Sequence, residues 1–234
     1  FWKASLCDKK IVTVSEFSKG RICSILHVKP ENVTVVYNGI SEQFDTIILS
    51  ENEKKIVREK YSLPDNYVLC LSTLEPRKNL RLLLDAYAEL YDEGIIEEIV
   101  LAGRKGWKMD DFLNGYKEDF LKYVHFTGFI DDDDLASVYK LAKVFVFPSL
   151  YEGFGIPPLE ALACGTPVIS SDAASMPEVL GDGAVYFKNR DKEDLKRVLR
   201  TTVSTEIKNS AMSEQIDKFQ WDTEAKKLLE QFEH

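Results

Sequence analysis

Residues 143–171 constrain the fold more than any other stretch, because two short apolar runs enclose a glycine-bearing loop and a short helical pattern. The runs at 143–147 and 167–171 are β-branched and aromatic, as expected of strands buried on both faces of a parallel sheet. Pro157 suits a first helical position, and Gly165 the end of the helix. In an open α/β sheet this junction lies at the carboxyl ends of the strands, where free backbone N–H groups and the helix dipole attract an anion such as phosphate.

Two carboxylates frame this loop, Glu152 before the glycines and Glu160 inside the predicted helix. A carboxylate repels a bound diphosphate, so hydroxyl groups of a sugar or a ribose are better partners for both side chains. Each residue alone has an ordinary explanation: Glu152 as a solvated loop charge and Glu160 as an acid that complements the helix dipole. A capping box does not explain Glu160, because Pro157 stands where the box needs Ser or Thr. Together with the glycines, the pair favours a site for a polyhydroxylated ligand.

Residues 148–165, PSLYEGFGIPPLEALACG, resemble the EGFGxPxxEAxAxGxPV signature of glycosyltransferase family 4, whose two glutamates also stand eight positions apart. Members of that family are retaining enzymes with the GT-B fold. The resemblance implies that Glu152 binds hydroxyls of the transferred sugar and that Glu160 binds the ribose. It also implies that the donor is bound by the residues between them, namely Gly153, Phe154, Gly155 and Ile156.

A second candidate anion site lies in the turn between a predicted strand at 67–73 and a predicted helix at 79–91. Arg77 and Lys78 stand there, after a strand and before a helix N-terminus, on the same edge of the sheet. Such a pair is otherwise simply solvated surface charge. Family 4 enzymes use an Arg and a Lys in this turn to hold the donor diphosphate. Many members place the Arg directly after the strand, where this chain has Thr73, so Arg77 would have to reach the phosphates from beside Lys78.

Two further positions follow predicted strands at 99–103 and 124–128. Gly103 permits close approach of a ligand to the backbone, although a glycine at a strand end is also an ordinary turn residue. Phe129 occupies the turn that lies against the nucleotide base in related enzymes, and the resemblance implies a base contact for it.

Four acids at 131–134 are similar to the DxD motif by which GT-A glycosyltransferases hold a divalent metal. Their position directly before an amphipathic helix at 134–142 favours a role at the helix N-terminus. A hard cation also needs more oxygen ligands than this segment supplies. We therefore expect no metal and no other cofactor.

The chain divides into four parts by its patterns. Residues 1–40 contain two strands and a helix, at 11–15, 33–37 and 16–27, and resemble the end of the amino-terminal acceptor domain of the family. The V-Y-N-G-I segment carries part of this resemblance, although Asn38-Gly39 is also a common turn dipeptide. We expect a linker at 41–66 with a short helix at 51–61, a donor-binding domain at 67–219 and a crossover helix at 220–234. The predicted fold class is α/β, a Rossmann-like parallel sheet with helices on both faces, as in the carboxyl-terminal half of a GT-B fold.

Composition restricts the partners and the compartment. The chain of 234 residues is 44% apolar and carries a net charge of −9 without a basic stripe, which argues against nucleic acid as a partner. No apolar run has the length of a transmembrane helix, and no signal peptide is visible. We expect a cytoplasmic protein that associates at most peripherally with the inner face of the membrane. The four cysteines have no paired or metal-ligand spacing and are interpreted as small buried hydrophobes.

These features predict a glycosyltransferase that moves a hexose from a nucleotide-diphospho-sugar to a saccharide or lipid-linked acceptor. The R-K-N and G-R-K-G-W segments are similar to bacterial mannosyl- and rhamnosyltransferases of polysaccharide synthesis. One alternative is a nucleotide-sugar-binding domain that is inactive without the missing amino-terminal domain or a separate chain. Another is a GT-B nucleotide-sugar epimerase, for which the expected acid and base groups are not evident.

Overall fold

Six parallel strands form the central sheet of the protein. The computed structural model describes residues 10–45, 47–71, 75–103, 112–202 and 209–232. The strand order is β5-β4-β3-β6-β7-β8, so the chain winds outward in one direction from β3 and in the other from β6. The strands are β3 (Val68–Leu71), β4 (Ile99–Ala102), β5 (Val124–Gly128), β6 (Val144–Phe147), β7 (Val168–Ser171) and β8 (Ala184–Phe187). The two directions meet between β3 and β6, which is the topological switch point of a doubly wound sheet.

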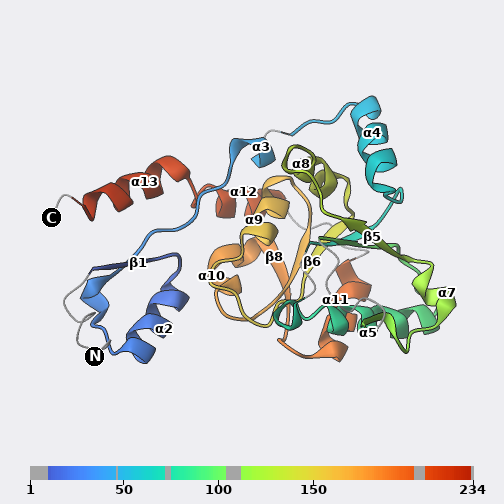
Figure 1. Ribbon diagram of the computed structural model, residues 1–234, viewed down its shortest axis with the longest axis horizontal. Coiled ribbons are helices and arrows are strands. Elements are labelled where there is room, and N and C mark those ends of the chain that lie inside the picture. Colours follow the sequence, from blue (N-terminus) through green and yellow to red (C-terminus); the bar gives the residue numbers. More distant parts are fainter. Residues whose placement is uncertain (1–9, 46, 72–74, 104–111, 203–208, 233–234) are drawn as a thin grey trace.

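Helices cover both faces of this sheet, as Figure 1 shows. On one face, Leu69 and Phe145 pack with α8 (Asp132–Leu141), α9 (Ile156–Ala163) and α12 (Asn209–Ile216). On the other face, Val68 and Val146 pack with α5 (Leu80–Asp92) and α11 (Lys192–Thr202). Burial of each such side chain stabilises the fold by about 1.5–3 kcal/mol. The α/β fold class predicted from the apolar runs is thereby confirmed.

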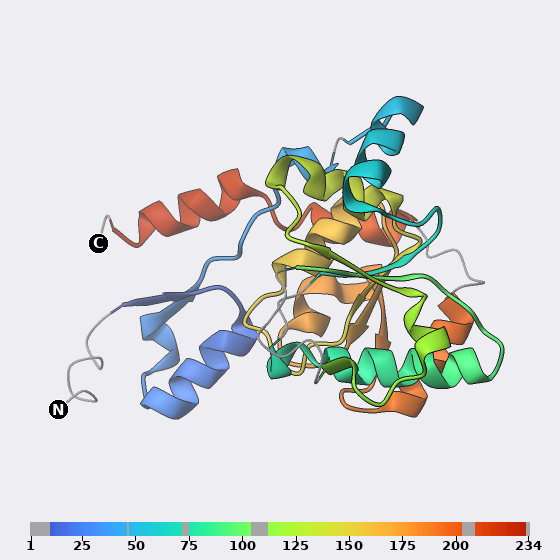
Figure 2. The same cartoon turned by 45° about the vertical axis from the view of Figure 1, so that its right-hand side comes forward.

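A smaller part of the molecule lies beside the sheet and is called the amino-terminal unit, residues 10–37. It consists of β1 (Ile11–Thr13), α2 (Glu16–Leu26), η1 (Pro30–Asn32) and β2 (Val33–Val35), with the two strands parallel. Helix α13 (Trp221–Glu230), near the other end of the chain, lies on the same side of the molecule (Figures 1 and 2).

Specific contacts join α13 to this unit. The buried carboxylate of Glu224 accepts a hydrogen bond from the backbone N–H of Tyr37 at 2.8 Å. Gln231 accepts one from Thr34 Oγ1 at 2.9 Å. Gly39 lies so close to the start of α13 that an added Cβ would be 2.6 Å from the backbone nitrogen of Trp221. Asn38 and Gly39 lie in no turn, and the glycine permits close packing against Trp221.

The segment at 41–66, expected as a linker, carries α3 (Glu42–Asp45) and α4 (Glu51–Tyr61) and contributes to the core. The acidic run at 131–134 fastens α4 to α8. Lys60 Nζ lies 2.7 Å from Asp131 and 2.5 Å from Asp134, whose carboxylate also accepts from the hydroxyl of Tyr61. These bonds hold the pKa of Asp134 below its usual value, through Lys60 first and Tyr61 second. Asp131 and Asp134 thus join the two helices.

Other elements lie close to their predicted positions. The remaining regular segments are η2 (Pro76–Lys78), α7 (Glu118–Leu121), α10 (Met176–Leu180) and η3 (Gly181–Gly183). Helix α12 is described from Asn209 and ends at Ile216. Cys70 and Cys164 are buried as expected, whereas Cys23 is half-exposed, and Cys7 lies outside the described residues.

Of the described helices, none combines the length and the apolar character that crossing a membrane requires.

Candidate active site

The candidate site lies at the switch point, where the segment after β3 meets the loop after β6. The backbone N–H of Leu150 donates to the carbonyl of Arg77 at 2.9 Å and ties the two segments together. Open α/β sheets bind their ligands in this place, outside the carboxyl ends of the strands. Sheet topology therefore brings together two motifs that stand 74 residues apart in the chain.

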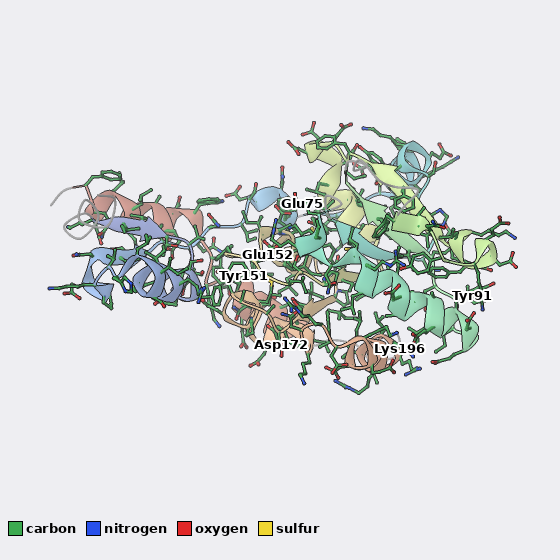
Figure 3. The ribbon with its side chains drawn as sticks, turned by 60° about the horizontal axis from the view of Figure 1, so that its bottom comes forward. Glu75, Tyr91, Tyr151, Glu152, Asp172 and Lys196 are labelled. Carbon is green, nitrogen blue, oxygen red and sulfur yellow. The ribbon has the colours of Figure 1, made fainter. Side chains whose placement is uncertain are left out.

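Three of the predicted site residues form one charged cluster here. Glu152 Oε1 lies 2.9 Å from Lys78 Nζ and 2.6 Å from the NH1 nitrogen of Arg77. Ser149 donates its hydroxyl to the same oxygen at 2.8 Å. The Lys78 and Glu152 side chains are only 14% and 13% exposed, so water screens their attraction weakly. Figure 3 shows Glu152 close to the junction with the amino-terminal unit, whereas Tyr91 and Lys196 lie at the far end of the molecule.

The glycine loop that follows Glu152 requires a glycine at position 155. Gly155 has φ +102°, and a Cβ there would lie 2.3 Å from Cε of Met176. Phe154 is buried against Phe219, with ring centroids 5.5 Å apart, while Ile156 is 42% exposed. Any side chain at position 155 would thus collide and be strained.

Serine hydroxyls hold the carbonyl groups of this loop. Ser175 donates to the carbonyls of Glu152 and Phe154 at 3.1 and 3.0 Å, and Ser15 donates to that of Gly153 at 2.6 Å. Every peptide bond is trans in the described chain, so the N–H groups of residues 153–155 point away from the serines. These N–H groups donate to no acceptor within the described residues.

Glu160 lies on α9 and is mostly buried. Its Oε2 accepts a hydrogen bond from the hydroxyl of Tyr139 at 3.0 Å, and its Oε1 has no hydrogen bond to any described residue. Burial raises the pKa of the Glu160 carboxyl, and the bond from Tyr139 opposes that effect in part. An ionised Glu160 therefore has one oxygen that can still accept from a hydroxyl group.

The remaining predicted residues occupy the same edge of the sheet. Gly103 follows β4 with φ +140°, and its N–H donates to the carbonyl of Gly128 at 2.8 Å. Phe129, directly after β5, is 55% exposed. Among the described residues, neither Gly103 nor Glu160 forms a hydrogen bond or an ion pair with Arg77, Lys78 or Glu152. Thr73 and the R-K-G-W part of the G-R-K-G-W segment lie outside the described residues.

Sequence reasoning missed the residues that support the site. Ser149, Ser175 and Tyr139 bond to Glu152, to its loop and to Glu160, but serines and tyrosines at these spacings carry no distinctive pattern. The contact of Ser15 with the carbonyl of Gly153 spans 138 positions and has no local signal in the sequence.

The sheet order, with its switch point between β3 and β6, is that of the α/β domains found in GT-B glycosyltransferases. The family "Glycosyl transferases group 1" matches residues 51–219, and the chain belongs to this family.

Relatives and solved structures agree with this assignment. The chain is 34% identical to the serotype-specific mannosyltransferase WbdA of Escherichia coli over 233 residues, which are 95% of this chain and 28% of that protein. A glycosyltransferase from Rickettsia africae has the same fold with a TM-score of 0.82, at 20% identity over 98% of this chain and 65% of that one. The Anabaena protein HepE, solved in complex with UDP and glucose, gives a TM-score of 0.79 at 19% identity over 96% and 63% of the two chains. The chain thus spans less than two thirds of each.

Proposed function

We propose that the protein is a retaining family 4 glycosyltransferase, the carboxyl-terminal half of a GT-B enzyme, that transfers a hexose from a nucleotide-diphospho-sugar to a saccharide or lipid-linked acceptor. The observation that carries this proposal is the meeting of Arg77, Lys78 and Glu152 beside a loop whose backbone N–H groups have no acceptor among the described residues. The mannosyltransferase name of WbdA and the UDP and glucose bound by HepE support the substrate class.

The chemistry separates two charges. As the bond from the anomeric carbon to the diphosphate breaks, positive charge develops on the sugar ring and negative charge on the leaving phosphate. Arg77, Lys78 and the amides of the glycine loop stabilise the leaving diphosphate, with no metal required. Glu152 binds hydroxyls of the sugar, and Glu160 binds the ribose hydroxyls through its unoccupied oxygen. Gly103 and Phe129 contact the nucleotide through the strand ends.

Retention of configuration follows from the direction of attack. The acceptor hydroxyl attacks the anomeric carbon on the face from which the phosphate leaves, and a phosphate oxygen takes the hydroxyl proton. Acceptor binding belongs to an amino-terminal domain or a separate chain, in the cytoplasm or at the inner face of the membrane. Because the chain spans 28% of WbdA, the alternative is a nucleotide-sugar-binding domain that is inactive without that partner.

Binding of nucleotide sugars to the chain tests this function first. A panel that includes GDP-mannose, UDP-glucose and dTDP-rhamnose is screened by thermal unfolding, since a ligand at about 100 times its Kd stabilises the native state by about 2.7 kcal/mol. We expect one of them to raise the unfolding temperature in the wild type and not in Lys78→Ala. Lys122→Ala, which changes an exposed lysine bonded to Asp119, is the matched control. If every nucleotide sugar leaves the wild type unchanged, the proposal is wrong. Product analysis of the full-length protein with and without acceptor then separates transfer from epimerisation.

A further inference from the structure

The glycine loop of the candidate site is held from two sides by serine hydroxyls. Ser175, which is fully buried, donates to the carbonyls of Glu152 and Phe154 and belongs to the sheet domain. The carbonyl between them, on Gly153, accepts from Ser15 Oγ at 2.6 Å and from Ser18 Oγ at 3.1 Å. Both of these serines belong to the amino-terminal unit. The central peptide of the loop is therefore oriented from outside the sheet domain.

Hydrogen bonds to Glu178 hold helix α2, and with it Ser15 and Ser18, against the sheet domain. The carboxylate of Glu178 on α10 accepts from the backbone N–H groups of Glu16 and Phe17 at 2.7 and 3.0 Å. It also accepts from the hydroxyl of Tyr37 at 3.0 Å, and burial together with this bond raises the pKa of Tyr37 to about 12. The Tyr37 hydroxyl thus stays protonated and donates at neutral pH. The Phe17 ring contacts Tyr151, directly before Glu152, with centroids 5.3 Å apart.

We propose that Ser15 and Ser18 are positioning residues of the donor site, which hold the Gly153 carbonyl so that the N–H of Phe154 faces the diphosphate. This inference rests on the proposed function. The physical reason is the planar trans peptide, in which fixing the direction of C=O fixes the opposite direction of the next N–H. A loop oriented before the ligand arrives loses less conformational freedom on binding. The amino-terminal unit would then set the affinity for the diphosphate part of the donor without touching it.

Ser18 offers the cleaner test of the two serines. Ser15 is also the N-cap of α2 and accepts from the N–H of Ser18 at 3.0 Å, so Ser15→Ala would weaken the helix as well. The Ser18 hydroxyl is half-buried and donates to Gly153 alone among the described residues. Ser24 on the same helix is exposed and has no described hydrogen bond through its side chain, so Ser24→Ala is the matched control.

The experiment compares affinities for GDP and UDP with those for guanosine and uridine, by calorimetry or NMR titration, in the wild type, Ser18→Ala, Ser18→Thr and Ser24→Ala. A neutral hydrogen bond is worth about 0.5–1.5 kcal/mol net, so we expect Ser18→Ala to weaken diphosphate binding about two- to tenfold. Nucleoside binding should stay unchanged. Ser18→Thr keeps the hydroxyl and should restore the affinity. Glu178→Gln, which loosens the anchor of α2, should give the same selective loss and serves if Ser18→Ala does not fold.

The possible results separate the inference from the function on which it rests. If the wild type binds a nucleoside diphosphate and both Ser18→Ala and Glu178→Gln bind it equally well, the positioning role is wrong and the function stands. A loss that is equal for nucleoside and diphosphate, or that Ser18→Thr does not restore, indicates general damage and also overturns the role. If the wild type binds no member of the panel, the proposed function is wrong, and the inference that rests on it is wrong as well.

Discussion

Lys78 Nζ lies 2.9 Å from Oε1 of Glu152, across the switch point of the sheet. Arg77 contacts the same oxygen. A diphosphate that binds these two cations must therefore share them with the carboxylate or displace it. The pairing supplies a negative charge for both cations, and it explains how Lys78 can lie at 14% exposure beside a second basic side chain.

This relationship predicts opposite effects of Glu152→Gln on two measurements. Removal of the carboxylate charge leaves Arg77 and Lys78 to the ligand, so the affinity for free GDP or UDP should rise about tenfold. Sugar transfer by the full-length protein should fall by about one to two powers of ten, because hydrogen bonds to a charged group are worth about 1.5–3 kcal/mol. Calorimetry and initial rates measure the two effects. Equal loss of both would show that Glu152 acts only as a structural partner of the cations.

Glu160 predicts a pH dependence of stability whose sign follows from its raised pKa. The folded state binds the Glu160 proton more tightly than the unfolded chain does, so this contribution to stability is present below the unfolded pKa, about 4.3, and is lost as pH rises through the higher folded pKa. Glu160→Gln cannot ionise, so it should raise the unfolding temperature above this pH window. Thermal unfolding from about pH 4 to pH 8 measures the effect.

Ionisation of Glu160 should lower the stability of the fold but raise the affinity for a nucleotide. If the ionised Glu160 accepts from the ribose, nucleotide affinity of the wild type should increase as pH rises through the raised pKa, and Glu160→Gln should bind weakly throughout. Tyr139→Phe removes the bond that opposes the effect of burial, so it should move the transition to higher pH. A nucleotide affinity that does not change with pH in the wild type would contradict the ribose assignment.

Local patterns were sufficient to predict the sheet and to place Arg77, Lys78 and Glu152 at one edge of it. Buried strands read as apolar runs, and Arg77, Lys78 and Glu152 stand beside strand ends that parallel topology brings to one edge. The sequence did not reveal that the carboxylate would pair with the cations, since the expected roles gave them different ligands. It also did not reveal contacts between distant segments, such as Lys60 with Asp134, because the partner of a surface charge is decided by helix docking and not by spacing.

Two buried tyrosines predict stability changes of opposite sign. The hydroxyl of Tyr87 is buried between α5 and the sheet without a hydrogen-bond partner among the described residues, and its desolvation costs free energy. Tyr87→Phe should therefore raise the free energy of unfolding by about 1 kcal/mol. The hydroxyl of Tyr67 donates to the carbonyl of Val138 at 2.7 Å, so Tyr67→Phe should lower it by about 1 kcal/mol. Urea denaturation with unchanged m-values measures both. A loss of stability in Tyr87→Phe would mean that its hydroxyl is satisfied.

The close contact between Gly39 and Trp221 predicts that α13 can pack here only if residue 39 has no side chain. A Cβ at this position would lie 2.5 Å from Cγ and 2.6 Å from the backbone nitrogen of Trp221, so Gly39→Ala must push α13 away from the amino-terminal unit. Overpacking of this kind costs about 1–3 kcal/mol, measurable by urea denaturation. Trp221→Ala should relieve only part of the cost in the double variant, because the collision with backbone remains.

Gly20→Ala is the control for this substitution. Gly20 in α2 has no heavy atom within 4 Å of the position that a Cβ would take, so Gly20→Ala should stabilise the protein by about 0.5–1 kcal/mol. Equal effects of the two substitutions would show that helix propensity, and not contact with α13, decides the result.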